Sequence, residues 1–143
     1  MSEGIRIAAL AREWIGTPYR HQGSLRGAGC DCLGLVRGVW REIHGREPET
    51  VPPYRPDWRE EEGRAALIAV AGRHLVKREG AAAVGDVLVF RLRRGAGARH
   101  CGILVTPDRF VHAQEEIGVV EAHLSDGWRV RVAGVFGFPP SSR

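Results

Sequence analysis

The sequence of 143 residues has no asparagine, a single lysine and only three cysteines. It also has no apolar run close to the roughly 20 residues that a bilayer-spanning helix needs, so no membrane span is expected. Three cysteines cannot form a fully paired disulfide framework, and Cys30 and Cys32 are too close in sequence for an easy bridge. The chain is long enough to bury a core without disulfides. This composition is therefore compatible with a reduced thiol that has a chemical role.

The net charge of the chain indicates which classes of binding partner to expect. Twenty-one basic and 17 acidic residues give a net charge of +4, which favours anionic partners slightly. No basic stripe alternates with aromatic residues, so we expect no nucleic-acid partner. Residues 1–14 include four charged side chains and lack the apolar core of a secretory signal. We expect the protein to be made in the cytoplasm without a signal peptide, and to be carried by something else if it acts outside the cell.

Two segments of the N-terminal half have helical periodicity. The first runs from about residue 5 to 14, with periodic positions at Ile5, Ala8, Ala9 and Arg12. The second runs from about 31 to 44, and its apolar face has no gap: Cys32, Leu35, Val36, Val39, Trp40 and Ile43. Asp31 is a suitable N-cap and Gly45 a suitable C-terminal stop. A third helix is predicted at about 60–73.

The C-terminal half changes to β-type segments. From residue 85 onward, turn signals separate five of them: DVLVFRL, HCGILVT, RFVHAQ, GVVEAHL and VAGVFGF. Helices followed by strands favour an α+β fold, with N-terminal helices packed on an antiparallel sheet of about five strands. We expect one domain over residues 1–143, with a proline-rich loop and a helix inserted at about 46–80.

Cys32 lies in the first turn of the second predicted helix, on its apolar face. Unpaired N–H groups and the positive end of the helix dipole favour a thiolate there. A thiolate is the nucleophilic form of cysteine, and the same N–H groups can stabilise an oxyanion. The alternative interpretation is that Cys32 is a small buried hydrophobic residue, as free cysteine often is. Position alone does not separate the two.

A nucleophilic cysteine requires a histidine base and a third group that orients the base. His100 and His112 lie at the start and the end of two consecutive β-type segments, so they can be neighbours on adjacent strands. His100 suits the base and His112 the orienting group. Because asparagine is absent, the orienting residue must be His, Gln, Asp or Glu. The alternative is that both histidines lack a catalytic role.

Five segments resemble, in order, the motifs of the NlpC-type cell-wall peptidases, a papain-like family of bacterial and phage cysteine hydrolases. They are WIGTPYRHQG, GCDCLGLVRGVW, VGDVLVF, RHCGILV and FVHAQ, and they cover roughly residues 10–122. The resemblance implies a papain-like fold, with the nucleophile at a helix N-terminus. It also implies a catalytic triad of Cys32, His100 and His112.

The resemblance also assigns roles to residues around the triad. At two positions, however, this sequence differs from the usual residue of the family. Tyr19 matches the family tyrosine near the active site, which is a candidate oxyanion or substrate contact. Asp31 matches the residue before the nucleophile, which we expect to be a helix cap first and a substrate contact second. Asp86 matches a position that is expected to be structural. Leu33 stands where the family usually has serine, and Cys101 stands where it usually has valine, which favours a packing role for Cys101.

The mechanism that this resemblance implies is acyl transfer. The Cys32 thiolate attacks an amide carbonyl, His100 protonates the leaving amine, and water then hydrolyses the thioester with His100 as base. In the family the amide usually lies in the stem peptide of peptidoglycan, often between D-glutamate and the diamino acid. Such peptides are acidic, which agrees with a mildly basic protein. We expect no cofactor and no metal.

Two other functions remain open at this point. A zinc site is the first, because Cys30, Cys32, His100 and Cys101 are suitable ligand types. Their spacing is not Cys-x-x-Cys, however, and adjacent His100 and Cys101 would point to opposite faces of a strand. The second is a catalytically silent binding or structural module, built on a degenerate peptidase fold, in the hub of a phage tail.

The segment GCDCLGLVRGVWRE and the PPY…DW loop resemble a narrower group. They are similar to the compact peptidases encoded among the tail genes of phages and gene transfer agents. This resemblance implies a tail-particle component, with tail hub or baseplate proteins as partners, that opens the wall in the target periplasm during delivery. A cytoplasmic enzyme that recycles wall peptides is the alternative.

Overall fold

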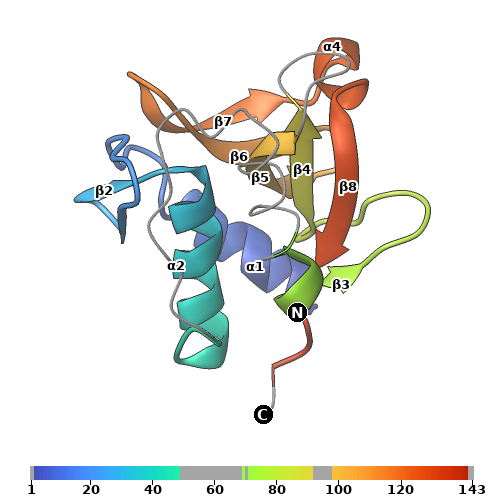
Figure 1. Ribbon diagram of the computed structural model, residues 1–143, viewed down its shortest axis with the longest axis horizontal. Helices are drawn as coiled ribbons and strands as arrows, with labels where there is room; N and C mark the ends of the chain where they lie inside the picture. Colours follow the sequence, from blue (N-terminus) through green and yellow to red (C-terminus); the bar gives the residue numbers. More distant parts are fainter. Residues whose placement is uncertain (1, 49–68, 70, 92–97, 142–143) are drawn as a thin grey trace.

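The computed structural model describes residues 2–48, 69, 71–91 and 98–141 of the chain. Two helices come first and most of the strands follow, so the predicted α+β class is confirmed (Figure 1). In chain order the elements are α1 (Glu3–Arg12), β1 (Ser24–Leu25), β2 (Gly29–Cys30), α2 (Cys32–His44), β3 (Val76–Lys77), β4 (Val87–Arg91), β5 (Ala98–Thr106), β6 (Arg109–Gln114), β7 (Gly118–His123), α4 (Asp126–Arg129) and β8 (Val132–Gly137).

The second helix, α2, has the limits that its sequence predicts. Asp31 is its N-cap and accepts a hydrogen bond from the Gly34 N–H. Gly45 ends it with a φ of 88°, a left-handed conformation that glycine adopts without strain. Of the six residues on the predicted apolar face, five are buried and Trp40 is partly buried against the core.

The first helix, α1, buries a face that shares only Ala8 with the predicted one. Ile7, Ala8 and Ala11 are buried, whereas Ile5 is 54% exposed. The reason is a close approach at Gly4, where a Cβ atom would lie only 2.3 Å from the carbonyl oxygen of Val84. Gly4 therefore faces the segment that leads into β4, and helical spacing then turns the residues three, four and seven positions later inward.

Six strands form one antiparallel sheet in the order β3-β8-β4-β5-β6-β7. Its strands β4 to β8 are the five predicted strands, and the two-residue β3 at one edge is an addition. β1 and β2 pair separately as a short antiparallel hairpin, which contacts α2. The turn signal between the last two predicted strands is the segment SDG, residues 125–127, and it begins the short helix α4 with Ser125 as the N-cap.

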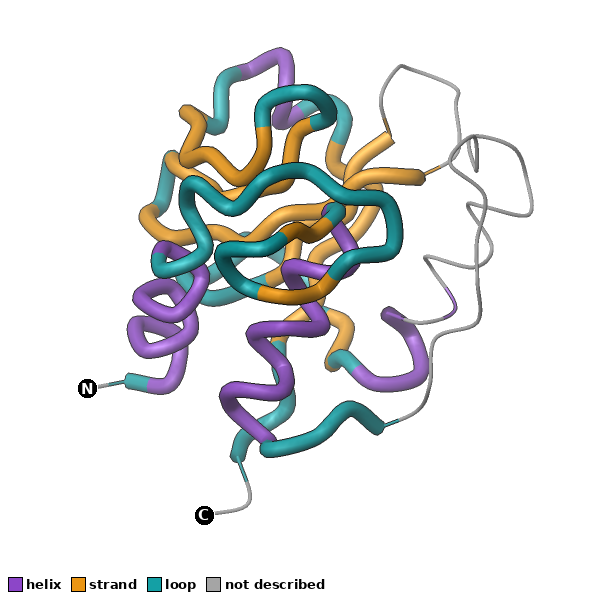
Figure 2. Tube along the Cα trace, turned by 90° about the vertical axis from the view of Figure 1, so that its left-hand side faces the viewer, coloured by secondary structure: helices purple, strands orange, loops and turns teal. Residues whose placement is uncertain are grey.

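The helices and the sheet form layers with one main core. α1 and α2 contact each other, and both contact β5, so they cover one face of the sheet (Figures 1 and 2). We call the opposite face the outer face. Alternation along β4 places Val87 and Val89 in the main core and sends Leu88 and Phe90 to a second cluster on the outer face. That cluster packs against Trp128 of α4.

The described residues leave part of the predicted insertion untested. Residues 69 and 71–74 are helical, which agrees with the end of the third predicted helix, but 60–68 and most of the proline-rich loop lie outside the described residues.

The two ends of the described chain meet, because the Ser141 N–H donates to a Glu3 carboxylate oxygen at 2.8 Å. Among the described residues, none of the helices combines the length and the apolar composition of a bilayer span.

Candidate active site

Cys32 is the first residue of α2, and Asp31 organises the chain around it. The Asp31 side chain is buried; Oδ1 accepts from the Gly34 N–H at 2.8 Å and Oδ2 from the Gln22 N–H at 2.7 Å. One carboxylate therefore caps the helix and also holds the segment that precedes β1. The Cys32 thiol lies where the unpaired N–H groups of the first turn favour negative charge.

The surroundings of Cys32 favour its thiolate. A hydrogen bond with the Cys101 side chain is the largest influence and lowers the pKa of Cys32; burial opposes it, and His100 lowers the pKa further through hydrogen bonding and its charge. In contrast, burial first and then the charge of Asp31 raise the pKa of Cys30 to about 12. All three cysteines are free and buried, and only the pKa of Cys32 is lowered.

His100 and His112 lie side by side on the neighbouring strands β5 and β6. Nε2 of His100 is 2.8 Å from Nδ1 of His112, and the two rings are nearly perpendicular, at 79°. The sequence predicted that these two histidines are neighbours, because a turn connects the two strands. Because Nε2 of His100 is engaged with His112, Nδ1 is the nitrogen of His100 that is left for the thiol of Cys32.

Burial keeps His112 neutral. The side chain is 2% exposed, and burial followed by the charge of His100 lowers the pKa of His112 to about 3. A neutral imidazole has one donor and one acceptor nitrogen. In the tautomer in which His100 donates, Nδ1 of His112 accepts the Nε2–H of His100. With both rings neutral, that tautomer leaves the lone pair of His100 on Nδ1, where it can accept a proton from Cys32.

An aromatic cover that the sequence analysis missed surrounds the two histidines. The Trp128 ring centroid lies 5.4 Å from that of His112 and 6.0 Å from that of His100. Phe110 lies 4.6 Å from His112, and Phe90 lies 6.1 Å from His100. The period-two pattern of β4 and β6 could have indicated the two phenylalanines. Trp128 follows a turn signal, and no local pattern relates it to the histidines.

Tyr19 lies beside the two residues that lead into α2. Its backbone bridges that of Cys30, and the next residue, Arg20, donates its N–H to the Cys30 carbonyl at 3.0 Å. Burial, and after it the charges of Cys32 and Asp31, raise the pKa of Tyr19 above that of an ordinary tyrosine. Tyr19 is therefore a neutral phenol that can donate a hydrogen bond. Its contact with a substrate or an oxyanion stays a prediction.

The ligands of the zinc alternative do not form a group. Cys101 lies in the main core, whereas the His100 ring packs on the outer face, as the alternation of β5 predicted. Within residues 2–48, 69, 71–91 and 98–141, no three side chains of His, Cys, Asp or Glu are arranged to hold a metal ion. The geometry therefore supplies no ligand set for this alternative.

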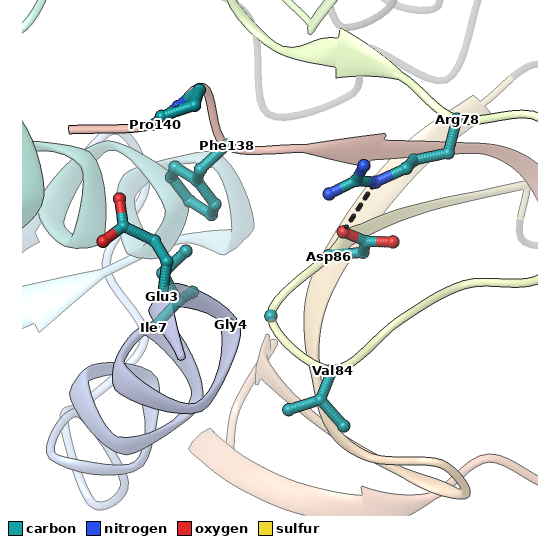
Figure 3. Close-up of a pocket in the computed structure, with 9 residues that line it drawn as sticks. Glu3, Gly4, Ile7, Arg78, Val84, Asp86, Phe138 and Pro140 are labelled. Atoms are coloured by element: carbon teal, nitrogen blue, oxygen red, sulfur yellow. Dashed lines mark hydrogen bonds and ion pairs between the residues drawn. The ribbon is translucent and has the colours of Figure 1, made fainter. Parts of the chain in front are cut away.

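Asp86 has a structural role in a different part of the molecule. Its Oδ1 accepts from Arg78 Nε at 3.1 Å and its Oδ2 from the Ala83 N–H at 2.8 Å. It lines a cavity of about 180 Å³ together with residues of α1 and of the C-terminal segment (Figure 3). Neither Cys32 nor the two histidines line this cavity, so it is separate from the candidate active site.

Comparison with known proteins identifies relatives of this chain. A sequence profile of the NlpC/P60 family matches residues 16–136. A probable endopeptidase of Haemophilus influenzae is 30% identical over 132 residues, which are 87% of this chain and 71% of that protein. The murein DD-endopeptidase MepS/murein LD-carboxypeptidase of Escherichia coli K12 is 31% identical over 127 residues, or 88% of this chain and 58% of that protein. For the gamma-DL-glutamyl hydrolase of Bacillus subtilis the identity is 30%, over 94% of this chain and 29% of that protein.

Solved structures share the fold. The NlpC/p60 domain of the peptidoglycan hydrolase SagA superposes with a TM-score of 0.65 at 22% identity, over 96% of this chain and 100% of that chain. An NlpC/P60 family protein from Bacillus cereus gives a TM-score of 0.69 at 19% identity, over 97% of this chain and 41% of that chain. These likenesses confirm the predicted α+β, papain-like fold class.

Proposed function

The chain belongs to the NlpC/P60 family, and from this membership we propose that it is a cysteine peptidase that hydrolyses amide bonds in the stem peptides of peptidoglycan. The observation that carries the proposal is the pairing of His100 with His112 at 2.8 Å, next to a cysteine at a helix N-terminus whose pKa is lowered. These are the parts that acyl transfer by a thiol requires.

In the proposed reaction the Cys32 sulfur bonds to the amide carbonyl carbon. First-turn N–H groups of α2 that Asp31 does not occupy are candidate donors to the oxyanion that forms. The carbon–nitrogen bond then breaks as His100 gives its Nδ1 proton to the leaving amine. Water adds to the thioester, His100 takes a proton from that water, and the thiolate of Cys32 leaves. His112 stays neutral throughout and accepts the Nε2–H of His100.

The substrate class is supported by relatives and by charge. One relative is named as a murein endopeptidase and carboxypeptidase and another as a γ-DL-glutamyl hydrolase. The stem peptides of peptidoglycan are acidic, and the chain has a net charge of +4. We therefore expect acidic peptides that contain glutamate to be better substrates than neutral peptides of equal length.

The test compares the wild-type protein with Cys32→Ala on purified peptidoglycan and on isolated muropeptides, under reducing conditions. Mass spectrometry should detect new amine ends with the wild type and none with Cys32→Ala. Cys30→Ala is the matched control, because it removes another buried free thiol only two residues away and should leave cleavage intact. Absence of cleavage by the wild type would contradict the proposal and favour a silent binding module.

We further propose that the protein is carried in a phage tail-like particle and opens the cell wall locally during delivery. The support for this is the resemblance of residues 29–42 and of the PPY…DW loop to tail-associated peptidases. The test is mass spectrometry of density-purified particles from cells that encode the chain. We expect the protein in the particle fraction at a constant ratio to tail proteins. Recovery only in the particle-free cell extract would contradict carriage and favour recycling of wall peptides.

A further inference from the structure

Two consecutive residues of β5 influence Cys32 from opposite faces of the sheet. The His100 ring lies on the outer face, where it packs 6.1 Å from Phe90, whereas Cys101 is 1% exposed in the main core. Side chains alternate along a strand, so this division follows from the backbone. Contact between α2 and β5 brings Cys101 against the first turn of the helix.

Cys101 is bonded to the backbone of the proposed nucleophile. Its Sγ–H donates to the carbonyl oxygen of Cys32 at 3.3 Å. A carbonyl oxygen has two lone pairs, so it can accept this bond in addition to the one that it accepts within the helix. An apolar side chain of the same size would pack at this position, but it would have no donor.

The sulfur of Cys32 is a candidate second acceptor for the Cys101 S–H, because Cys101 lies against the first turn of α2, where Cys32 is the first residue. Hydrogen bonding between the two side chains lowers the pKa of Cys32 more than any other contact, and it raises the pKa of Cys101. A single S–H proton serves one acceptor at a time. Rotation about the Cβ–Sγ bond moves only this proton, so the donor can change acceptor without displacing a heavy atom in the packed core.

We propose that Cys101 is a positioning residue for Cys32. Its S–H donates to the Cys32 carbonyl while Cys32 is a thiol, and it turns to the Cys32 sulfur when the thiolate forms. In the first state the bond holds the first turn of α2 against the sheet; in the second it stabilises the negative charge. The inference rests on the proposed function, in which Cys32 is the nucleophile, but it concerns the ionisation of Cys32 alone.

Any measurement of this ionisation includes the other groups around Cys32. The titratable groups that act on Cys32 or respond to its charge come from four segments: His100 and Cys101 in β5, Asp31 at the N-cap, Cys30 in β2, and Tyr19 in the segment before β1. The test therefore changes only Cys101 between the proteins that are compared.

The test uses two variants of equal shape. Threonine has a hydroxyl group where valine has a methyl group. Cys101→Val therefore removes the hydrogen-bond donor, and Cys101→Thr keeps one. Each variant and the reference protein also carry Cys30→Ser, which leaves Cys32 as the single thiol of the tryptic peptide 27–37. The measurement is the rate of iodoacetamide alkylation of Cys32, followed by mass spectrometry of this peptide across a pH series.

We expect Cys101→Val to raise the midpoint of the alkylation profile by about one pH unit, and Cys101→Thr to restore most of this shift. A midpoint in Cys101→Val equal to that of the reference would overturn the inference. So would an equal rise in both variants, because it would show that only packing had changed. If circular dichroism shows that Cys101→Val does not fold, the pair Cys101→Ala and Cys101→Ser makes the same comparison.

This experiment separates the inference from the proposed function, because alkylation needs no peptide substrate. A protein that cleaves peptidoglycan but has the same alkylation midpoint with valine at position 101 would keep the function and lose the inference. A protein that shows the shift but cleaves nothing would keep the inference on ionisation and lose the proposed activity.

Discussion

Nε2 of His100 lies 2.8 Å from Nδ1 of His112, although the two residues are 12 positions apart in sequence and occupy different strands. The antiparallel pairing of β5 with β6 produces this neighbourhood. Phe110 fixes the second ring from one side, with its centroid 4.6 Å away. Strand pairing and this ring contact therefore hold the two imidazoles in a fixed relative position, as a base and its orienting partner require.

His112→Asn should keep an acceptor for the His100 N–H, whereas His112→Leu removes it. We expect His112→Leu to lower kcat/KM for a muropeptide by about 100-fold, because His100 loses the bond that aims its other nitrogen at Cys32. His112→Asn should lose clearly less, since an amide oxygen can take the same bond. Steady-state kinetics with both variants is the measurement.

Thermal unfolding provides the control for this comparison, because both variants replace a side chain that is 2% exposed. Kinetics should be compared at a temperature where both are folded. Equal losses of kcat/KM in the two variants would contradict a role for the acceptor and leave His112 as a packing residue.

Stability should depend on pH through His112. Its pKa is lowered from 6.5 to about 3 in the folded protein, so between these values the unfolded chain binds a proton that the folded chain does not. The free energy of unfolding should therefore be highest above pH 6.5 and fall, by roughly 4 kcal/mol at most, as the pH drops toward 3. Urea unfolding at a series of pH values measures this slope.

His112→Asn isolates the contribution of this residue, because asparagine does not titrate. Cys32 is present in both proteins. Its lowered pKa also makes the free energy of unfolding fall as the pH falls, and it does so equally in each protein. The stability difference between the wild type and His112→Asn should shrink as the pH falls. A difference that stays constant with pH would show that His112 is not held neutral in the folded protein.

Much of the fold and site could be predicted because the relevant signals are local. The apolar face of α2 repeats at helical spacing, and Asp31 and Gly45 mark its ends. Strands β4 to β8 are short apolar segments bounded by turn residues. His100 and His112 follow from the same logic, since a turn between two strands brings their residues together.

The remaining features depend on contacts that are distant in sequence. The buried face of α1 is set by the approach of Gly4 to Val84, which no periodicity in an alanine-rich helix reveals. The second bond of Asp31, to Gln22, depends on the path of the chain before β1. Trp128 contacts the histidines only because α4 lies on the outer face of the sheet.

Asp31 should be more important for stability than an ordinary helix cap. Asp31→Ala removes the cap of α2 and also leaves the Gln22 N–H without the carboxylate, so we expect a loss of about 2 kcal/mol or more. Ser2→Ala is the matched control. It removes the N-cap of α1, whose bond to Ile5 is exposed, and should cost about 0.5–1 kcal/mol. Urea unfolding compares the two, and equal losses would contradict the double role of Asp31.

Trp128 should help to keep His112 neutral, because its ring lies 5.4 Å from that of His112 and adds to the burial of the His112 side chain. Trp128→Ala should raise the pKa of His112 from about 3 toward 6.5, whereas Trp128→Phe keeps an aromatic cover and should leave the pKa low. Titration of the histidine ring protons by NMR measures this directly. A protonated His112 can no longer accept the His100 N–H, so the acid limb of the kcat/KM profile should move to higher pH in Trp128→Ala alone. An unchanged His112 titration in that variant would show that Phe110 and the burial within β6 suffice.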